Sequence, residues 1–287
     1  MSAFAALSAA LDRLADSGSA ITVWWRDDDA VAATPALDRL LAVAGDHAVP
    51  LALAVIPARL QDSLGPRLAG LDGRRWPDGR LSLLQHGYSH TNHAPDGEKK
   101  CELGPHRPLP LTHGDLATGW ARLQTLATAG TGPARLLPVL VPPWNRIAPG
   151  LIPALPEMGY GGLSRFGRRA RPRPLAGLLE INCHLDPVDW RGRHGPAHAF
   201  MGEAPALAPL LEFTAALGTP DLGAPDMTAP GPAAEPFGLL THHLDHDHDG
   251  WRFLQRLIGL LCQHPAVHFA AAADLFPPPQ PSGKAPV

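Results

Sequence analysis

Residues 83–93 have the sequence LLQHGYSHTNH, an apolar run that ends abruptly in three histidines. The apolar residues Leu81 to Leu84 predict a buried strand. His86 and His90 are four residues apart, so one helical turn or one tight loop can direct both imidazoles at the same point. Two imidazoles at the end of a buried strand are typical of a metal site, which still needs a carboxylate ligand.

Strands and helices are predicted to alternate on both sides of this stretch. Apolar and β-branched runs predict strands at 20–25, 51–56, 81–84, 136–141, 162–166, 178–184, 237–241 and 268–271. Helical spacing of leucines predicts helices at 3–17, 35–43, 60–71, 115–129, 147–158, 207–217 and 251–262. Residues 94–112, rich in proline, glycine and charge, predict an insertion after the histidines. The alternation favours an α/β fold with a parallel sheet or barrel.

The chain shows no internal repeat and no convincing domain boundary. We therefore expect a single catalytic domain over residues 1–276, followed by a disordered tail at 277–287. An apolar share of 45% with 18% charged residues is ordinary for a globular protein with a sizeable core. The net charge of −3 gives no electrostatic reason to expect nucleic acid as a partner.

The three cysteines are far apart and form neither a disulfide framework nor a CxxC zinc motif, which favours a reducing compartment. The first residues lack the basic start and apolar run of a signal peptide. No stretch approaches the apolar length of a membrane span. We expect a cytoplasmic protein without a membrane span; the sequence gives no indication of its oligomeric state.

Polar residues with useful chemistry follow the carboxyl ends of most of the predicted strands. They are the triplet 27–29 (Asp-Asp-Asp), His86 with His90, Asn145 with Arg146, Asp186 with Asp189, and His242 with His243. Because the carboxyl ends of parallel strands converge on one face, these side chains predict an active site there.

The aspartate triplet supplies the missing carboxylate. Alone, it could equally be a helix cap or an acidic turn. Together with His86 and His90, it favours a divalent cation held by one aspartate and two histidines. Such a site leaves open positions for water, and a neighbouring aspartate can serve as a general base.

Five short motifs resemble those of the polysaccharide deacetylases with a NodB-homology domain, a family of metal-dependent carbohydrate esterases. In chain order they are Asp28-Asp29, His86-x-x-Ser89-His90, Pro142-Pro143-Trp144, Asp186-x-x-Asp189-Trp190 and Leu240-x-His242. Each motif alone is weak, but five in order on matching strand ends are specific. The resemblance covers residues 20 to 275, approximately, and implies a distorted, incomplete (β/α) barrel.

Residue by residue, the resemblance implies that Asp29, His86 and His90 bind a divalent metal, usually zinc. It makes Asp28 the base that activates water and His242 the acid that protonates the leaving group. The pair Asp27-Asp28 remains an alternative to Asp28-Asp29, although the small residue Ala30 favours the latter. His243 remains an alternative to His242.

The sequence departs from the family pattern in its third motif. The family has an arginine there that pairs with the catalytic base, and this chain has Val141. Arg146, five residues later, is our candidate for supplying the charge. In the fourth motif we assign Asp186, rather than Asp189, to orienting the catalytic histidine.

Several other residues have a functional and a structural interpretation. Trp144 and Trp190 could form a wall for a sugar ring or belong to the core. His93 is more readily a loop histidine than a ligand. The acids in residues 245–249 (DHDHD) suit the start of the following helix better than a second metal site. The charge run at 98–102 is either solvated or part of a closure over substrate.

The function implied is metal-dependent hydrolysis that removes an N- or O-linked acetyl group from a carbohydrate or a sugar-containing metabolite inside the cell. One alternative is a catalytically silent carbohydrate-binding or scaffold protein of the same fold, which the missing arginine favours. The other is a hydrolase of a different non-peptide C–N bond, such as an amide or imide. The substrate and the physiological metal are not indicated by the sequence.

Overall fold

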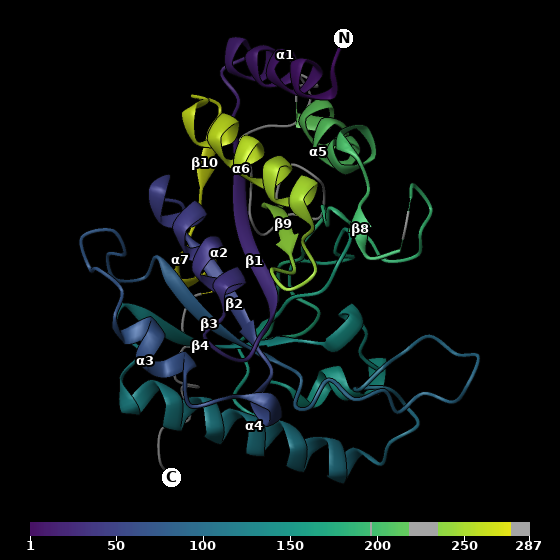
Figure 1. Cartoon of the computed structure of the whole chain (residues 1–287). Helices are drawn as coiled ribbons and strands as arrows, with labels where there is room; N and C mark the ends of the chain where they lie inside the picture. Colours follow the sequence, from purple (N-terminus) through teal and green to yellow (C-terminus); the bar gives the residue numbers. More distant parts are fainter. Residues whose placement is uncertain (196, 218–234, 277–287) are drawn as a thin grey trace.

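A parallel sheet curls round to form most of a barrel (Figure 1). The computed structural model describes residues 1–195, 197–217 and 235–276, in which eight strands make up this sheet. Their order is β10-β1-β2-β3-β4-β5-β6, and β9 also pairs with β1. The strands are β1 Ile21–Ala30, β2 Leu51–Val55, β3 Leu81–His86, β4 Ala134–Val141, β5 Gly162–Leu163, β6 Leu179–Glu180, β9 Phe237–Thr241 and β10 Val267–Phe269.

The ring closes beyond β6 through isolated bridges instead of full strands. Phe166 bridges to Cys183, and Leu185 bridges to Leu239 of β9, both in parallel fashion. Gly238 is required at this seam because a Cβ there would collide with the backbone of residues 182–183. The sheet is therefore a distorted, incomplete (β/α) barrel, as predicted.

Helices cover the outside of the sheet (Figure 1). They pack in pairs, α1 with α5, α2 with α6 and α3 with α4. The α-helices are α1 Ala3–Asp16, α2 Pro35–Asp46, α3 Leu64–Ala69, α4 Leu109–Gly130, α5 Glu203–Leu217, α6 His248–Gln263 and α7 Ala272–Leu275. Three 3-10 turns are η1 Pro57–Arg59, η2 Pro143–Asn145 and η3 Pro149–Ala154, and an antiparallel hairpin joins β7 Val188–Asp189 to β8 Ala199–Phe200.

Alternate residues of each strand face two different apolar cores. Trp25 of β1 and Leu83 of β3 belong to the core beneath helices α1, α2 and α6. Trp24, Leu84 and Leu240 belong to a second core that also holds Val139 and Val141 and fills the barrel. Side chains alternate between the two faces of a strand. The second residue after an inward-facing one therefore also faces inward.

Several elements differ from the sequence prediction. β1 continues through the aspartates to Ala30, since β2 and β9 pair with it on its two sides at Arg26 and Asp27. The helix expected at 115–129 begins at Leu109, inside the expected insertion. The helices expected at 60–71 and 147–158 are shorter, and in the second, which contains Pro153, only a 3-10 turn forms. The β7–β8 hairpin was not predicted.

The tail predicted at 277–287 falls outside the described residues, as do residues 218–234. No helix in the described part of the chain has the length and apolar character needed to cross a membrane.

Candidate metal centre and active site

Three side chains converge at the carboxyl ends of β1 and β3. Asp29 lies near the end of β1, His86 is the last residue of β3, and His90 lies in the loop that follows. The Nε2 atoms of His86 and His90 are 3.3 and 3.5 Å from Asp29 Oδ1. The three ligand atoms all lie within 4.8 Å of one another, close enough to hold one metal ion.

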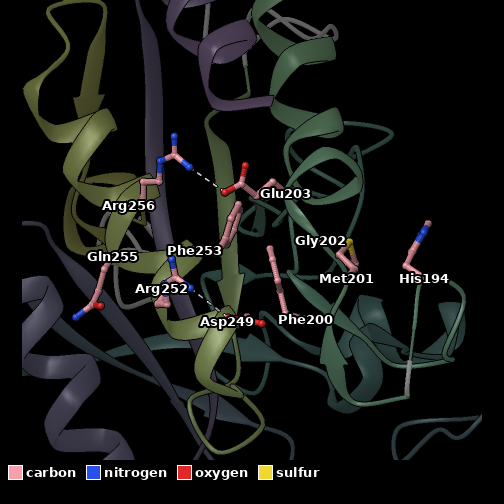
Figure 2. Close-up of a pocket in the computed structure, with 10 residues that line it drawn as sticks. All are labelled: His194, Phe200, Met201, Gly202, Glu203, Asp249, Arg252, Phe253, Gln255 and Arg256. Carbon is pink, nitrogen blue, oxygen red and sulfur yellow. Dashed lines mark hydrogen bonds and ion pairs between the residues drawn. The ribbon is translucent and has the colours of Figure 1, made fainter. Parts of the chain in front are cut away.

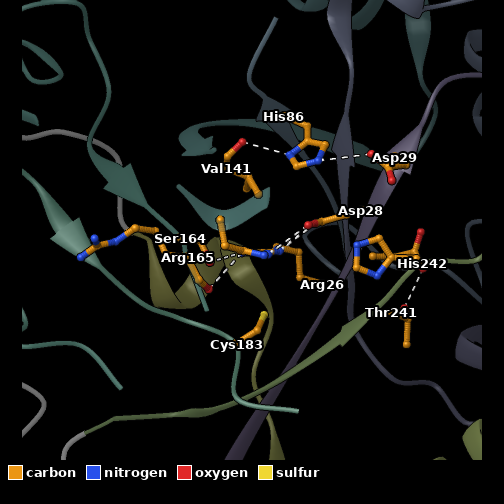
Figure 3. A network of polar contacts seen from close by, with 12 residues as sticks. Arg26, Asp28, Asp29, His86, Val141, Ser164, Arg165, Cys183, Thr241 and His242 are labelled. Carbon is orange, nitrogen blue, oxygen red and sulfur yellow. Dashed lines mark hydrogen bonds and ion pairs between the residues drawn. The ribbon is translucent and has the colours of Figure 1, made fainter. Parts of the chain in front are cut away.

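The ring of His86 is oriented by a backbone carbonyl. Its Nδ1 lies 3.0 Å from the carbonyl oxygen of Val141, so Nδ1–H donates this hydrogen bond (Figure 3). The neutral ring then carries its lone pair on Nε2, the atom that faces Asp29. Metal-binding histidines are held in this way in most known sites.

The backbone at the site is strained. Asp29 and His90 have φ values of 69° and 55°, and Trp144 and Asn145, which follow β4, have 53° and 56°. Non-glycine residues rarely adopt this left-handed conformation, and such strain is concentrated at functional sites. These four are among six non-glycine residues with positive φ in the described chain. The strained backbone therefore lies at the candidate ligands and next to them.

The electrostatics of the site favour a negatively charged Asp29. Burial opposes ionisation, but the hydrogen bond with His86 and the charges of His86, His242 and His90 hold the pKa of Asp29 well below its usual range. Burial also lowers the pKa of His86, but Asp28 and Asp29 outweigh it and raise that pKa. A proton and a metal ion therefore compete for the same imidazole.

The donor set fits a divalent metal. Asp29 Oδ1 is buried, and its contacts with the two imidazole nitrogens, at 3.3 and 3.5 Å, are long and poorly aligned. A buried acceptor of this kind is costly unless something positive occupies the space before it. Two histidines and one carboxylate suit zinc and several other transition metals and leave positions open. The identity of the metal does not follow from these ligands.

Arg26 supplies the positive charge beside the candidate base. It precedes Asp28 by two residues on β1, so both side chains face the barrel interior. Arg26 Nε lies 2.8 Å from Asp28 Oδ1, and Nη2 donates to Asp28 Oδ2 at 3.0 Å (Figure 3). Both residues are buried. This paired contact fixes the plane of the Asp28 carboxylate.

Two further side chains hold the guanidinium of Arg26 in place. Its Nη1 donates to Ser164 Oγ at 2.7 Å, and Nη2 donates to Asn145 Oδ1 at 2.8 Å. Arg146, our candidate for this charge, donates to the carbonyl of Lys100 at 2.7 Å instead. Arg26 of β1, and not Arg146, therefore pairs with Asp28 in this structure.

The two alternative residues from the sequence pair with each other on the opposite face of the sheet. Asp27 Oδ1 lies 2.5 Å from His243 Nδ1, and Asp27 Oδ2 accepts from Thr241 Oγ1 at 2.6 Å. Burial lowers the pKa of His243, but the charge of Asp27 and its hydrogen bond raise it overall. Asp27 and His243 are therefore engaged in a closed structural pair.

His242 faces inward beside Asp186 and Trp190. Its Nδ1 lies 3.5 Å from Asp186 Oδ2, and Trp190 Nε1 donates to the same oxygen at 2.7 Å. The Trp190 ring meets the His242 ring edge-on, with 4.6 Å between centroids. Burial raises the pKa of Asp186, although the charge of His242 opposes this. Asp189 instead accepts from the backbone of the following turn, at Arg191 and His194.

The two predicted wall residues flank opposite histidines. Trp144 is half-buried and lies 4.3 Å from the ring centroid of His90, while Trp190, beside His242, is 37% exposed. Both tryptophans therefore contact site residues, and neither belongs to an apolar core cluster. Contact with a sugar remains a prediction.

The second histidine-rich stretch is structural. Asp247 caps α6 by accepting from Gly250 N at 2.7 Å, as its position before the helix predicts. His93 lies beside Arg107, with 3.2 Å between Nε2 and Nη1, and is not among the ligands. Among the described residues, Asp29, His86 and His90 form the one group arranged to hold a metal ion.

A hollow of about 800 Å³ lies elsewhere, between β8 and α6 (Figure 2). Its two arginines are paired with neighbouring acids, Arg256 with Glu203 and Arg252 with Asp249. It shares no residue with the metal centre.

Sequence reasoning missed Arg26, Ser164 and Glu102. Arg26 had a signal, because a residue two positions before Asp28 on a strand faces the same way. Glu102, which binds the histidine loop, had none, since it lies in a run of charges that resembles a solvated surface.

Comparisons with solved structures identify the fold. A crystal structure assigned to a polysaccharide deacetylase of Mycobacterium smegmatis matches 90% of this chain and 89% of its own, at 15% identity and a TM-score of 0.62. The chain has the fold of a polysaccharide deacetylase. This confirms the resemblance found in the sequence at the level of the fold.

Other solved structures match less closely. The family 4 acetyl xylan esterase of Clostridium thermocellum, in complex with a cobalt ion, matches 89% of this chain and 90% of its own at 14% identity and a TM-score of 0.49. The family 4 carbohydrate esterase of Streptomyces lividans, in complex with acetate, matches 88% and 92% at 13% identity and a TM-score of 0.47. No family model and no curated protein matches the sequence.

Proposed function

We propose that this protein is a metal-dependent hydrolase that removes an acetyl group, N- or O-linked, from a carbohydrate or a sugar-containing metabolite. One observation carries the proposal. Three potential ligands (Asp29, His86, His90), an arginine-held carboxylate (Asp28) and the histidine that follows β9 (His242) share the inner rim of a deacetylase-type barrel.

The cation would be held by Asp29, His86 and His90, and we propose zinc. When bound, a divalent cation lowers the pKa of water and polarises an acyl oxygen. Asp28 Oδ1 lies beside Arg26 Nε but accepts no well-aligned hydrogen bond, so it keeps a lone pair for an attacking water. Asp28 in this position would take the proton of that water as it attacks the acyl carbon.

We assign His242 to the leaving-group side of the scissile bond. Asp186 lies 3.5 Å from Nδ1 and Trp190 packs against the ring, so the pair favours one ring orientation. In the proposed reaction His242 donates a proton to the amine or alcohol as the acyl bond breaks. Trp144 and Trp190 would then bracket the sugar that carries the acetyl group.

The contacts in the site weaken one of the two alternative functions and leave the other unaffected. The missing arginine at Val141 was the main support for a silent binding protein, and the contact between Arg26 and Asp28 removes that support. A hydrolase of another C–N bond would use the same residues and differs only in substrate. The cytoplasmic location inferred from the sequence stays a prediction.

Metal content and acetate release test the proposal together. The purified chain is stripped with a chelator, reloaded with Zn²⁺ or Co²⁺, and assayed against N-acetylated chito-oligosaccharides and O-acetylated xylo-oligosaccharides. We expect one metal per chain and acetate release that Asp28→Asn abolishes. Metal binding without acetate from either substrate would favour another C–N bond. A wild-type chain that binds no metal would refute the proposal.

A further inference from the structure

A buried carboxylate that is not one of the three candidate ligands accepts hydrogen bonds from the loop that carries His90. Glu102 is 2% exposed. Its Oε1 accepts from Ser89 N at 2.7 Å and Ser89 Oγ at 3.0 Å, and its Oε2 accepts from His90 N at 3.2 Å. Tyr88 N lies 3.3 Å from both oxygens. Three successive backbone amides and one hydroxyl thus converge on one side chain.

Glu102 is itself fixed to the body of the protein. The next residue, Leu103, is buried, bridges to Ile147 and accepts from Ala148 N at 2.7 Å. On the other side, Cys101 N donates to the side-chain oxygen Asn92 Oδ1 at 2.9 Å, and the Cys101 carbonyl accepts from His93 N at 3.0 Å. The insertion therefore returns to the loop and brings the carboxylate to a defined place.

The loop conformation needs this support. Gly87 and His90 have φ values of 53° and 55°, so the turn is left-handed at both ends. A Cβ at Gly87 would collide with Glu102 and Pro143, which shows how closely the carboxylate approaches the backbone. Residues 88–90 are partly buried, and without this carboxylate their three amides would lose the acceptor that holds them in the turn.

We propose that Glu102 is a positioning residue of the metal centre, whose carboxylate holds residues 88–90 in the turn that aims His90 at Asp29 and so sets the affinity for a divalent cation. The inference rests on the metal centre of the proposed function but not on acetyl hydrolysis. Glu102 is not among the three residues arranged to hold a metal ion. It acts through the backbone of a ligand, where outer contacts typically change metal affinity about 10–100-fold.

The test compares Glu102→Gln with Glu98→Gln in the full chain. Glu98 lies in the same insertion but is exposed and pairs with His106 at 2.9 Å, so it controls for loss of one charge. Zn²⁺ affinity is measured by competition with a chromophoric chelator. We expect Glu102→Gln to bind Zn²⁺ about 10–100-fold more weakly than wild type. Glu98→Gln should match wild type.

Two further measurements separate positioning from general stability. Amide exchange at Ser89 and His90 should accelerate in metal-free Glu102→Gln, because one amide oxygen cannot replace two carboxylate oxygens. Melting of the metal-free protein reports any purely structural role. A variant that melts lower but keeps wild-type Zn²⁺ affinity would overturn the inference. If Glu102→Gln does not fold, Glu102→Asp, which keeps the charge on a shorter side chain, must show the weaker binding.

Acetate release is recorded on the same samples. Zn²⁺ binding by wild type without acetate release would contradict the proposed function and leave the role of Glu102 standing. Equal Zn²⁺ affinity in wild type and Glu102→Gln would contradict the role of Glu102 and leave the proposed function standing. Absence of Zn²⁺ binding by wild type would overturn both.

Discussion

Neighbouring residues at the ends of β1 and β9 differ in their hydrogen bonding according to which face of the sheet their side chains lie on. On the outer face, Asp27 accepts from Thr241 Oγ1, from His243 N and from the His243 ring, and both residues of the pair are closed off from solvent. On the inner face, Asp28 Oδ1, Asp29 Oδ1 and His242 Nδ1 are buried without a well-aligned hydrogen bond from the described residues.

The contrast shows that hydrogen-bond satisfaction, not acidity, separates the structural aspartate from the two candidate site aspartates. Asp28 Oδ1 and Asp29 Oδ1 have only poorly aligned contacts with their neighbours, and a poorly satisfied buried acceptor is costly. These two acceptors are explained if water, substrate and a cation complete them. The outer pair, in contrast, needs nothing further and joins β1 to β9.

The largest expected effect comes from breaking the inner face. Asp28→Asn removes the proposed base and should lower kcat/KM for acetate release by ~10²–10⁴-fold. Zn²⁺ should still bind, because Asp28 is not a ligand. Steady-state acetate release with measured metal content checks this. Activity within tenfold of wild type would exclude Asp28 as the base.

Breaking the outer face should affect stability instead. Asp27→Asn leaves His243 without its buried counterion and should lower the free energy of unfolding by about 3–5 kcal/mol. Zn²⁺ affinity and acetate release per folded molecule should remain close to wild type. Urea unfolding of the metal-free protein gives the first quantity. Loss of activity without loss of stability would reverse the roles assigned to the two faces.

A milder change tests how the inner carboxylate is held. Arg26→Lys keeps the charge but cannot make both contacts to Asp28, nor reach Ser164 and Asn145 together. We expect kcat/KM to fall by an amount equivalent to about 1–2 kcal/mol of transition-state stabilisation, and the metal affinity to stay unchanged. Arg146→Lys is the matched control and should behave as wild type. The reverse ranking of the two variants would restore Arg146 to the site.

The smallest expected effect is a dependence of stability on pH from the outer pair. The pKa of His243 is raised from its ordinary value of 6.5 in the folded protein, so this contribution to stability is complete below pH 6.5. It is lost as the pH rises through the folded pKa. Urea unfolding of the metal-free chain from pH 6 upward should show this decline, and His243→Gln should reduce it.

The sequence was sufficient for the fold and for the three candidate ligands, Asp29, His86 and His90, which the structure brings together. Buried strands alternate with helices, and His86 and His90 follow one strand at a four-residue spacing, while the resemblance supplied Asp29. The choice between Asp27 and Asp28 could not be predicted. Residues 23–25 (Val-Trp-Trp) are apolar on both faces, and therefore do not reveal which face lines the barrel.

The remaining site residues depend on contacts that local patterns do not encode. Asn145 reaches Arg26 only because the turn at residues 144–145 is left-handed, which its proline-rich surroundings do not predict. Glu102 becomes a loop anchor only because the insertion folds back on the histidines. Charge and composition describe such a segment as surface until its path is known.

The pairing of Arg26 with Asp28 also bears on how the site assembles. An ion pair between residues of two separate strands forms only after those strands have come together. Here the two side chains are separated by a single residue, so extending one strand is enough to bring them to the same side. The closure entropy of a long intervening loop is not part of forming this pair. The base and its counterion can thus form as a local unit, before the barrel around them is complete.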